Sequence, residues 1–147
     1  MKPTITTVGM LSILGAVSYA STAVPKDEDV KLLCDVEIVE RFDTGEKHHS
    51  WEQVPVDVGQ HAGTLTIAIN GLHLKFGMTT GIADVHDESV EGRWQLYQDK
   101  AEYHIKRRVT IDRNSGHFSF TSYKSDVKQQ IDAEGMCSSV DMTKRKF

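Results

Sequence analysis

The densest group of chemically active side chains is Asp84-Val85-His86-Asp87-Glu88, where four of the five residues are of types that bind metal ions. Carboxylate and imidazole groups in a loop can surround a cation. The segment has neither the glycine hinge and ligand spacing of an EF-hand loop nor a Cys or His pair at zinc spacing. We therefore interpret it as a solvated acidic loop, with a metal site at its four ligand-type residues as the alternative.

The histidines offer two further arrangements. His73 and His104 are predicted on outward-facing positions, and together with His117 they could bind zinc or copper if their strands are neighbours. Asp112 and His117 could form a carboxylate–imidazole pair across a turn, but this pair would be exposed to solvent and no serine stands in a nucleophile elbow. Because no acid, base and nucleophile converge, the sequence predicts a protein without enzymatic activity or a cofactor.

The basic run Lys106-Arg107-Arg108 lies in a segment of alternating polarity. This alternation places Lys106 and Arg108 outward and Arg107 inward. A buried guanidinium needs a carboxylate or carbonyl partner, or a position at the mouth of a barrel. Arg107 is therefore expected either to extend its head group out of a barrel end or to hold a ligand anion inside.

The elements that must position these residues are strands. Apolar and polar residues alternate with a period of two from Val30 to Val39, and the same period recurs in later segments, which is typical of half-buried strands. Pro55 lacks an amide proton, so its segment belongs at a sheet edge or bulge. We count seven to eight strands and predict an all-β fold, an antiparallel barrel or sandwich, with at most one short helix over 125–134.

Two hairpins are predicted in detail. Asn70-Gly71 between alternating runs indicates a two-residue turn that pairs Ile67 with Leu74 and Ile69 with Leu72. Arg113-Asn114-Ser115-Gly116 indicates a four-residue turn with a left-handed Gly116, and Asp112 would accept hydrogen bonds from the loop amides. This second register pairs Ile111 with Phe118 and leaves Arg113 as an exposed turn residue whose replacement by Ala should have little effect.

The N-terminus and the cysteines indicate export. Residues 1–23 read as a secretory signal peptide, with a short apolar run and small residues before cleavage after Ala20 or Ala23. Removing the segment leaves residues 24–147 as one β domain with no transmembrane segment. Cys34 and Cys137, the only two cysteines, are expected to form a disulfide in an oxidising compartment, which would constrain the unfolded chain by about 4–5 kcal/mol.

A resemblance at the level of layout supports the same compartment. The chain has Leu33-Cys34 in its first strand, the turn from Ile111 to Gly116, and Gly135-Met136-Cys137 before a basic tail that ends in Phe147. In this layout it resembles small, functionally uncharacterised exported proteins of proteobacteria, in which an Ile-Asp-Arg-x-(Ser/Thr)-Gly turn recurs near a C-terminal cysteine. The resemblance implies an exported β fold and implies no activity.

The net charge of the chain bears on the class of partner that it could bind. The formal net charge is −4, and loss of Lys2 with the signal peptide makes the mature chain one unit more negative, which gives no support to nucleic-acid binding. We expect a periplasmic or secreted, non-enzymatic protein that binds a protein partner or serves as an envelope accessory factor through loops at 48–61 and 79–92. The alternative is a small-ligand carrier that uses the barrel interior, with Arg107 as its polar anchor.

Overall fold

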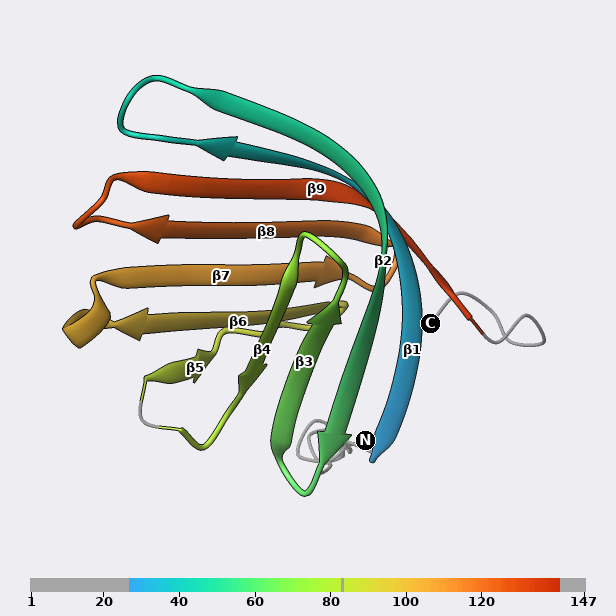
Figure 1. Ribbon diagram of the computed structural model, residues 1–147. Coiled ribbons are helices and arrows are strands. Elements are labelled where there is room, and N and C mark those ends of the chain that lie inside the picture. The colour runs from blue at the N-terminus through green and yellow to red at the C-terminus, as the bar shows by residue number, and fades with distance from the viewer. Residues whose placement is uncertain (1–26, 83, 141–147) are drawn as a thin grey trace, which may run out of the picture.

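The computed structural model describes residues 27–82 and 84–140, which form one antiparallel sheet of nine strands (Figure 1). The strands are β1 (Glu28–Arg41), β2 (Lys47–His61), β3 (Thr64–Asn70), β4 (Lys75–Thr79), β5 (Val85–Asp87), β6 (Arg93–Lys100), β7 (Ile105–Asp112), β8 (His117–Lys124) and β9 (Gln129–Ser139). A 3-10 helix, η2 (Ala101–Tyr103), joins β6 to β7. The predicted all-β antiparallel fold is confirmed. The predicted signal peptide and the basic tail lie outside the described residues.

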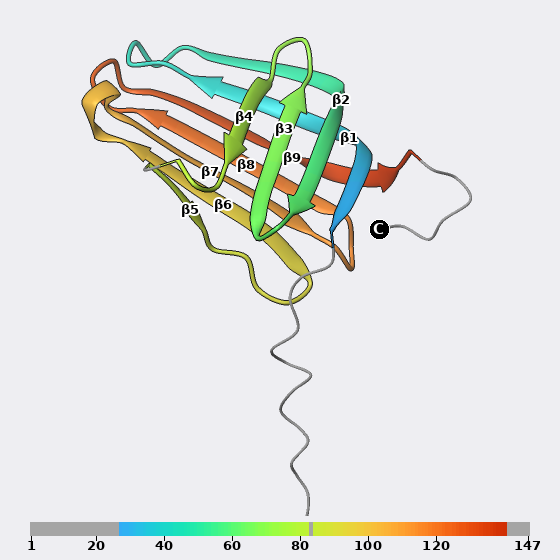
Figure 2. The ribbon, with the colours of Figure 1, turned by 90° about the horizontal axis from the view of Figure 1, so that it is seen from below.

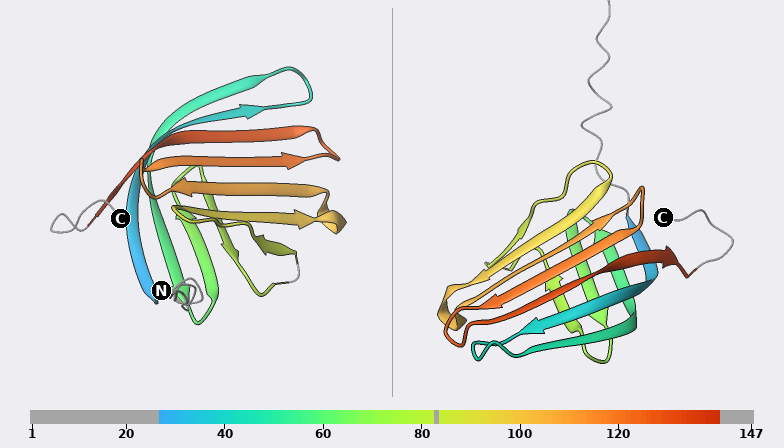
Figure 3. Two further views of the ribbon diagram at one scale, coloured as in Figure 1. Left: turned by 180° about the vertical axis from the view of Figure 1, so that it is seen from behind. Right: turned by 90° about the horizontal axis from the view of Figure 1, so that it is seen from above.

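The sheet curls into a nearly closed barrel (Figures 1 and 3). The long strands β1 and β2, of 14 and 15 residues, bend so that β3 and β4 come to face β6, β7 and β8 (Figure 2). The spatial order of the strands is β4-β3-β2-β1-β9-β8-β7-β6-β5, so β4 and β5 end the sheet. In the part of the chain that the structure describes, these two end strands do not pair with each other. We call their unpaired edges the seam.

The inner face of the sheet carries one apolar core. In β1 the apolar residues at every second position are at most 5% exposed, namely Leu32, Cys34, Val36 and Ile38. Every other strand adds inward-facing residues to the same cluster. The alternation of apolar and polar residues in the first strand therefore matches the inner and outer faces of the sheet.

The β7–β8 hairpin has the predicted register. Ile111 pairs with Phe118 and Val109 with Phe120. Gly116 has a φ of 86°, a left-handed conformation that a side chain would disfavour. Asp112 accepts hydrogen bonds from the amides of Asn114 and Ser115 at 2.9 and 3.0 Å. Asp112 and Gly116 act within the turn itself, and this locality made its register predictable.

The predicted register of the β3–β4 hairpin is wrong by four residues. Asn70 pairs with Lys75 and Ile69 with Phe76, so the connection is a four-residue loop, Gly71–Leu74, instead of a two-residue turn. The carboxylate of Glu52 on β2 accepts hydrogen bonds from the amides of Leu72 and His73. These contacts satisfy two loop amides at once and so stabilise the wider loop. Leu72 is 84% exposed as a result.

The first and last strands, β1 and β9, pair in the middle of the sheet. Cys34 of β1 and Cys137 of β9 are directly opposite each other and form the predicted disulfide. A Cβ added to Gly135 of β9 would overlap the backbone carbonyl of Asp35, so these strands approach too closely for any other residue. The short helix considered for 125–134 is wrong, because a turn at 125–128 leads directly into β9, which pairs with β1 on one side and β8 on the other.

Candidate functional site

Three of the four ligand-type residues in the acidic segment have polar partners within the protein. Asp84 lies 3.9 Å from the ammonium of Lys100, and Asp87 accepts a hydrogen bond from the amide of Ser89 at 2.8 Å. Glu88 accepts hydrogen bonds from Gln95 and Arg108, and these donors hold the pKa of its carboxyl below the usual range. Across residues 27–82 and 84–140, no three or more Asp, Glu, His or Cys side chains are grouped so that they could hold a metal ion.

The three candidate histidines stand at separate places. His73 lies in the β3–β4 loop, with its Nδ1 atom 3.4 Å from Glu52. His104 follows η2 in a left-handed conformation and precedes β7, whereas His117 begins β8 beside the far end of β7. The condition for a shared zinc or copper site, that the three histidines lie on neighbouring strands, is not met.

The carboxylate–imidazole pair across the β7–β8 turn is also not formed. The hydrogen bonds from Ser115 and Asn114 occupy the Asp112 carboxylate and lower its pKa. The Nε2 atom of His117 lies 3.8 Å from Glu134 on the neighbouring strand β9. The polar residues of this turn therefore serve its backbone geometry.

Arg107 faces the interior, as its position in the alternation indicates. Its guanidinium lies over the ring of Phe76, 4.3 Å from the centroid, and it donates hydrogen bonds of 3.4 Å to Ser122 and Gln98. All of these partners are neutral, and burial lowers the pKa of the guanidinium. Arg107 thus connects β7 to β4 across the barrel at one end of the seam.

Arg113 makes a long-range contact that sequence reasoning missed. Its guanidinium lies 4.1 Å from the ring centroid of the buried Trp94 and donates a 3.1 Å hydrogen bond to Glu28 at the start of β1. The residue is therefore not the freely exposed turn residue that was expected. No local pattern could have revealed this contact, because Glu28 lies 85 residues away in the chain.

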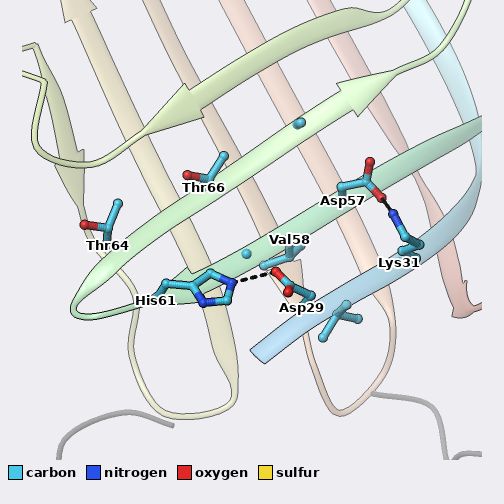
Figure 4. A pocket seen from close by; sticks show the side chains of 10 residues that line it. Asp29, Lys31, Asp57, Val58, His61, Thr64 and Thr66 are labelled. Atoms are coloured by element: carbon cyan, nitrogen blue, oxygen red, sulfur yellow. Dashed lines mark hydrogen bonds and ion pairs between the residues drawn. The ribbon is translucent and has the colours of Figure 1, made fainter. Parts of the chain in front are cut away.

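A shallow groove of about 460 Å³ crosses the outer face of β1, β2 and β3 (Figure 4). Its floor is made by small residues, among them Gly59, Thr66 and Ala68. At one end the imidazole of His61 meets Asp29 at 2.7 Å, and at the other Lys31 meets Asp57 at 3.3 Å. The hydrogen bond and the charge of Asp29 raise the pKa of His61. Each cation of the groove already has an anionic partner.

A second outer surface carries an exposed tryptophan. Trp51 is 75% exposed and lies opposite Glu37 of β1. It belongs to a strand, since β2 covers the region 48–61 for which a loop was expected. β2 pairs with β3 only from Val56 onward, so the preceding residues form a free edge, as Pro55 predicted. Trp51 is therefore held on a regular, paired strand with its indole toward solvent.

Carboxylates lie on the two strands next to this tryptophan, β1 and β9. Glu37 stands directly opposite Glu134 of β9, and Asp35 stands opposite Met136, which is 49% exposed. The contacts seen for the two glutamates are with imidazoles, His49 at 3.1 Å from Glu37 and His117 from Glu134. Within the described part of the chain no Lys or Arg pairs with these three carboxylates. We call Asp35, Glu37, Trp51, Glu134 and Met136 the Trp51 face.

No protein-family model and no curated protein matches this chain. Function must therefore be argued from the surfaces themselves. Among the described residues, none belongs to a helix long and apolar enough to cross a membrane. The Trp51 face combines the features that a macromolecular partner recognises: exposed apolar side chains, uncompensated charge and a rigid backbone.

Proposed function

We propose that the protein is an exported, non-enzymatic binding protein that captures a partner protein in the periplasm or outside the cell through its Trp51 face. The observation that carries this proposal is the 75% exposure of Trp51 on a regular strand. Tryptophan is among the residue types most enriched at the positions that dominate binding energy in protein interfaces. Because the strand already fixes the backbone, little conformational entropy is lost when the indole is covered.

The charge of the face indicates the chemistry of the partner. Glu37 and Glu134 are like charges in directly opposing positions, an arrangement that destabilises a sheet. A lysine or arginine from a partner would relieve this repulsion and would pair with carboxylates that have no Lys or Arg partner in the described chain. The expected partner surface is therefore basic, with an apolar pocket for the indole.

The packing of the barrel interior favours binding through the outer surface over the carriage of a small ligand inside. The inward-facing apolar side chains form one packed cluster, and the guanidinium of Arg107 stacks on the ring of Phe76. The buried Cys34–Cys137 disulfide favours an oxidising compartment, in agreement with the proposed export.

Matched variants test the proposal. Trp51→Ala removes the indole, and Val90→Ala removes another exposed apolar side chain, 56% exposed, from the connection between β5 and β6. Proteins that the disulfide-bonded wild type captures from envelope extract would be identified by mass spectrometry, purified and titrated against each variant. We expect Trp51→Ala to weaken binding at least tenfold, which corresponds to about 1.4 kcal/mol, and Val90→Ala to leave it unchanged. Equal binding by folded Trp51→Ala protein would refute the proposal.

A further inference from the structure

The seam provides a second surface that is separate from the Trp51 face. Strands β4 and β5 are the two ends of the sheet, and neither is paired along its outer edge within the described residues. An unpaired edge presents backbone N–H and C=O groups that can add a further strand. At five residues, β4 (Lys75–Thr79) is the longer of the two edges, since β5 has only three residues. Of these two end strands, β4 is therefore the better template.

Side chains at the edge of β4 offer little protection against such pairing. Lys75 is its only charged residue, and a Cβ added to Gly77 would meet nothing within 4 Å. Exposed apolar residues stand beyond both ends of the strand, Leu72 at 84% and Ile82 at 55% exposure. Natural edge strands are usually blunted by charges, bulges or coverage. This edge has one lysine and apolar flanks, which favour contact with another chain.

Arg107 adds a charge to the same place. Its guanidinium contacts Phe76, the second residue of β4, at 4.3 Å. Its two hydrogen bonds, to Ser122 and Gln98, are long at 3.4 Å and go to neutral groups. No carboxylate of the described chain forms an ion pair with it. A partly buried cation without an anion is costly, and the missing anion can come from a chain that lies along β4.

We propose that an extended segment of a partner protein adds to the free edge of β4 and places an Asp or Glu carboxylate on Arg107. Backbone hydrogen bonds along the five residues of β4 would supply affinity without regard to sequence. Specificity would come from the carboxylate, with apolar residues on either side to cover Leu72 and Ile82. Arginine suits this role because its planar guanidinium can bind a carboxylate with two parallel hydrogen bonds.

A displayed library of random ten-residue segments, selected on the disulfide-bonded protein, tests this inference. We expect the selected peptides to share one acidic position, and replacement of that residue by Asn or Gln to weaken binding at least tenfold. Arg107→Gln should abolish the preference for the acidic residue. Lys106→Gln, which removes a neighbouring outward charge, should leave it intact.

Further measurements distinguish strand addition at β4 from peptide binding elsewhere on the protein. Methylation of alternate peptide nitrogens should weaken binding, and the bound peptide should protect the amides of β4 from hydrogen exchange. Arg107→Lys keeps a cation at the position and provides a folded comparison if Arg107→Gln is unstable. The inference would be overturned if the selection yielded no binders or if the selected peptides shared no acidic residue. It would also be overturned if peptide binding survived Arg107→Gln or if protection from hydrogen exchange were confined to β2. Trp51→Ala should not affect these peptides, so the two surfaces can fail independently.

Discussion

Arg107 of β7 and Phe76 of β4 meet across the interior of the barrel, with 4.3 Å between the guanidinium carbon and the ring centroid. This contact joins β4, an end strand of the sheet, to β7 on the facing side of the barrel. Phe76 in turn lies 5.4 Å from Phe120 of β8, measured between ring centroids. The position of β4 therefore depends on side chains that reach it from strands with which it does not pair.

The Arg107–Phe76 contact should have a measurable coupling energy. A double-mutant cycle with Arg107→Gln and Phe76→Leu, followed by chemical unfolding, should give about 0.5–2 kcal/mol, the range for a cation–π contact that is partly removed from water. The parallel cycle with Lys106→Gln and Phe76→Leu should give a coupling energy near zero. Additive effects of Arg107→Gln and Phe76→Leu would show that the stacking contributes nothing to stability.

Arg113 should stabilise the other end of the barrel. Arg113→Ala removes both the contact with the Trp94 ring and the hydrogen bond to Glu28, and should lower the free energy of unfolding by about 1–2 kcal/mol. In a Trp51→Phe background Trp94 is the sole tryptophan, and its emission should shift to longer wavelength as water reaches the ring. An unchanged emission maximum in the Arg113→Ala protein would mean that the arginine does not cover Trp94.

Gly135 should tolerate no side chain. A Cβ at this position overlaps the carbonyl of Asp35, and the backbone of β1 cannot move away because the adjacent disulfide holds the strands together. We expect Gly135→Ala to cost about 3 kcal/mol or more in thermal or urea unfolding, or to prevent folding. Gly77→Ala, where the added methyl group enters open space, is the matched control and should change stability little. Equal stability of the two variants would contradict the close approach of β1 and β9.

Glu52 should determine the conformation of the β3–β4 loop. Glu52→Ala leaves the amides of Leu72 and His73 without their acceptor and should cost about 1–3 kcal/mol. Hydrogen exchange of these two amides, followed by NMR, should become faster. Gln53→Ala alters the neighbouring residue, whose side chain bonds to Asp35 on the outer face, and should leave both amides protected.

His61 should titrate above its ordinary pKa of 6.5 because it donates a hydrogen bond to Asp29 and lies near the charge of that carboxylate. The contact therefore stabilises the fold in full below pH 6.5, and its contribution is lost as the pH rises through the raised pKa. Histidine NMR titration should show the pKa falling toward 6.5 in Asp29→Asn protein. Asp57→Asn changes a carboxylate at the opposite end of the same groove and should not move it.

Local patterns in the sequence determined the strands and one of their hairpins. Alternation identified the buried face of β1, and Asp112 with Gly116 specified the β7–β8 turn, because a two-residue period and a tight turn depend only on neighbours in the chain. The disulfide followed from the presence of only two cysteines in a chain with a signal-like N-terminus. None of these inferences depended on how distant strands meet.

The surfaces that matter for function were decided by the tertiary structure. Glu52, from β2, determined the β3–β4 register that the Asn-Gly pair alone misassigned. Trp51 and Glu134 come to one face only because β9 returns beside β1, and Arg107 lies at the seam only because the sheet curls until β7 faces β4. Each of these contacts joins residues that lie far apart in the sequence, so no local pattern predicts that they meet. Strand order and curvature bring them together, and these properties arise from burying the whole inner face at once.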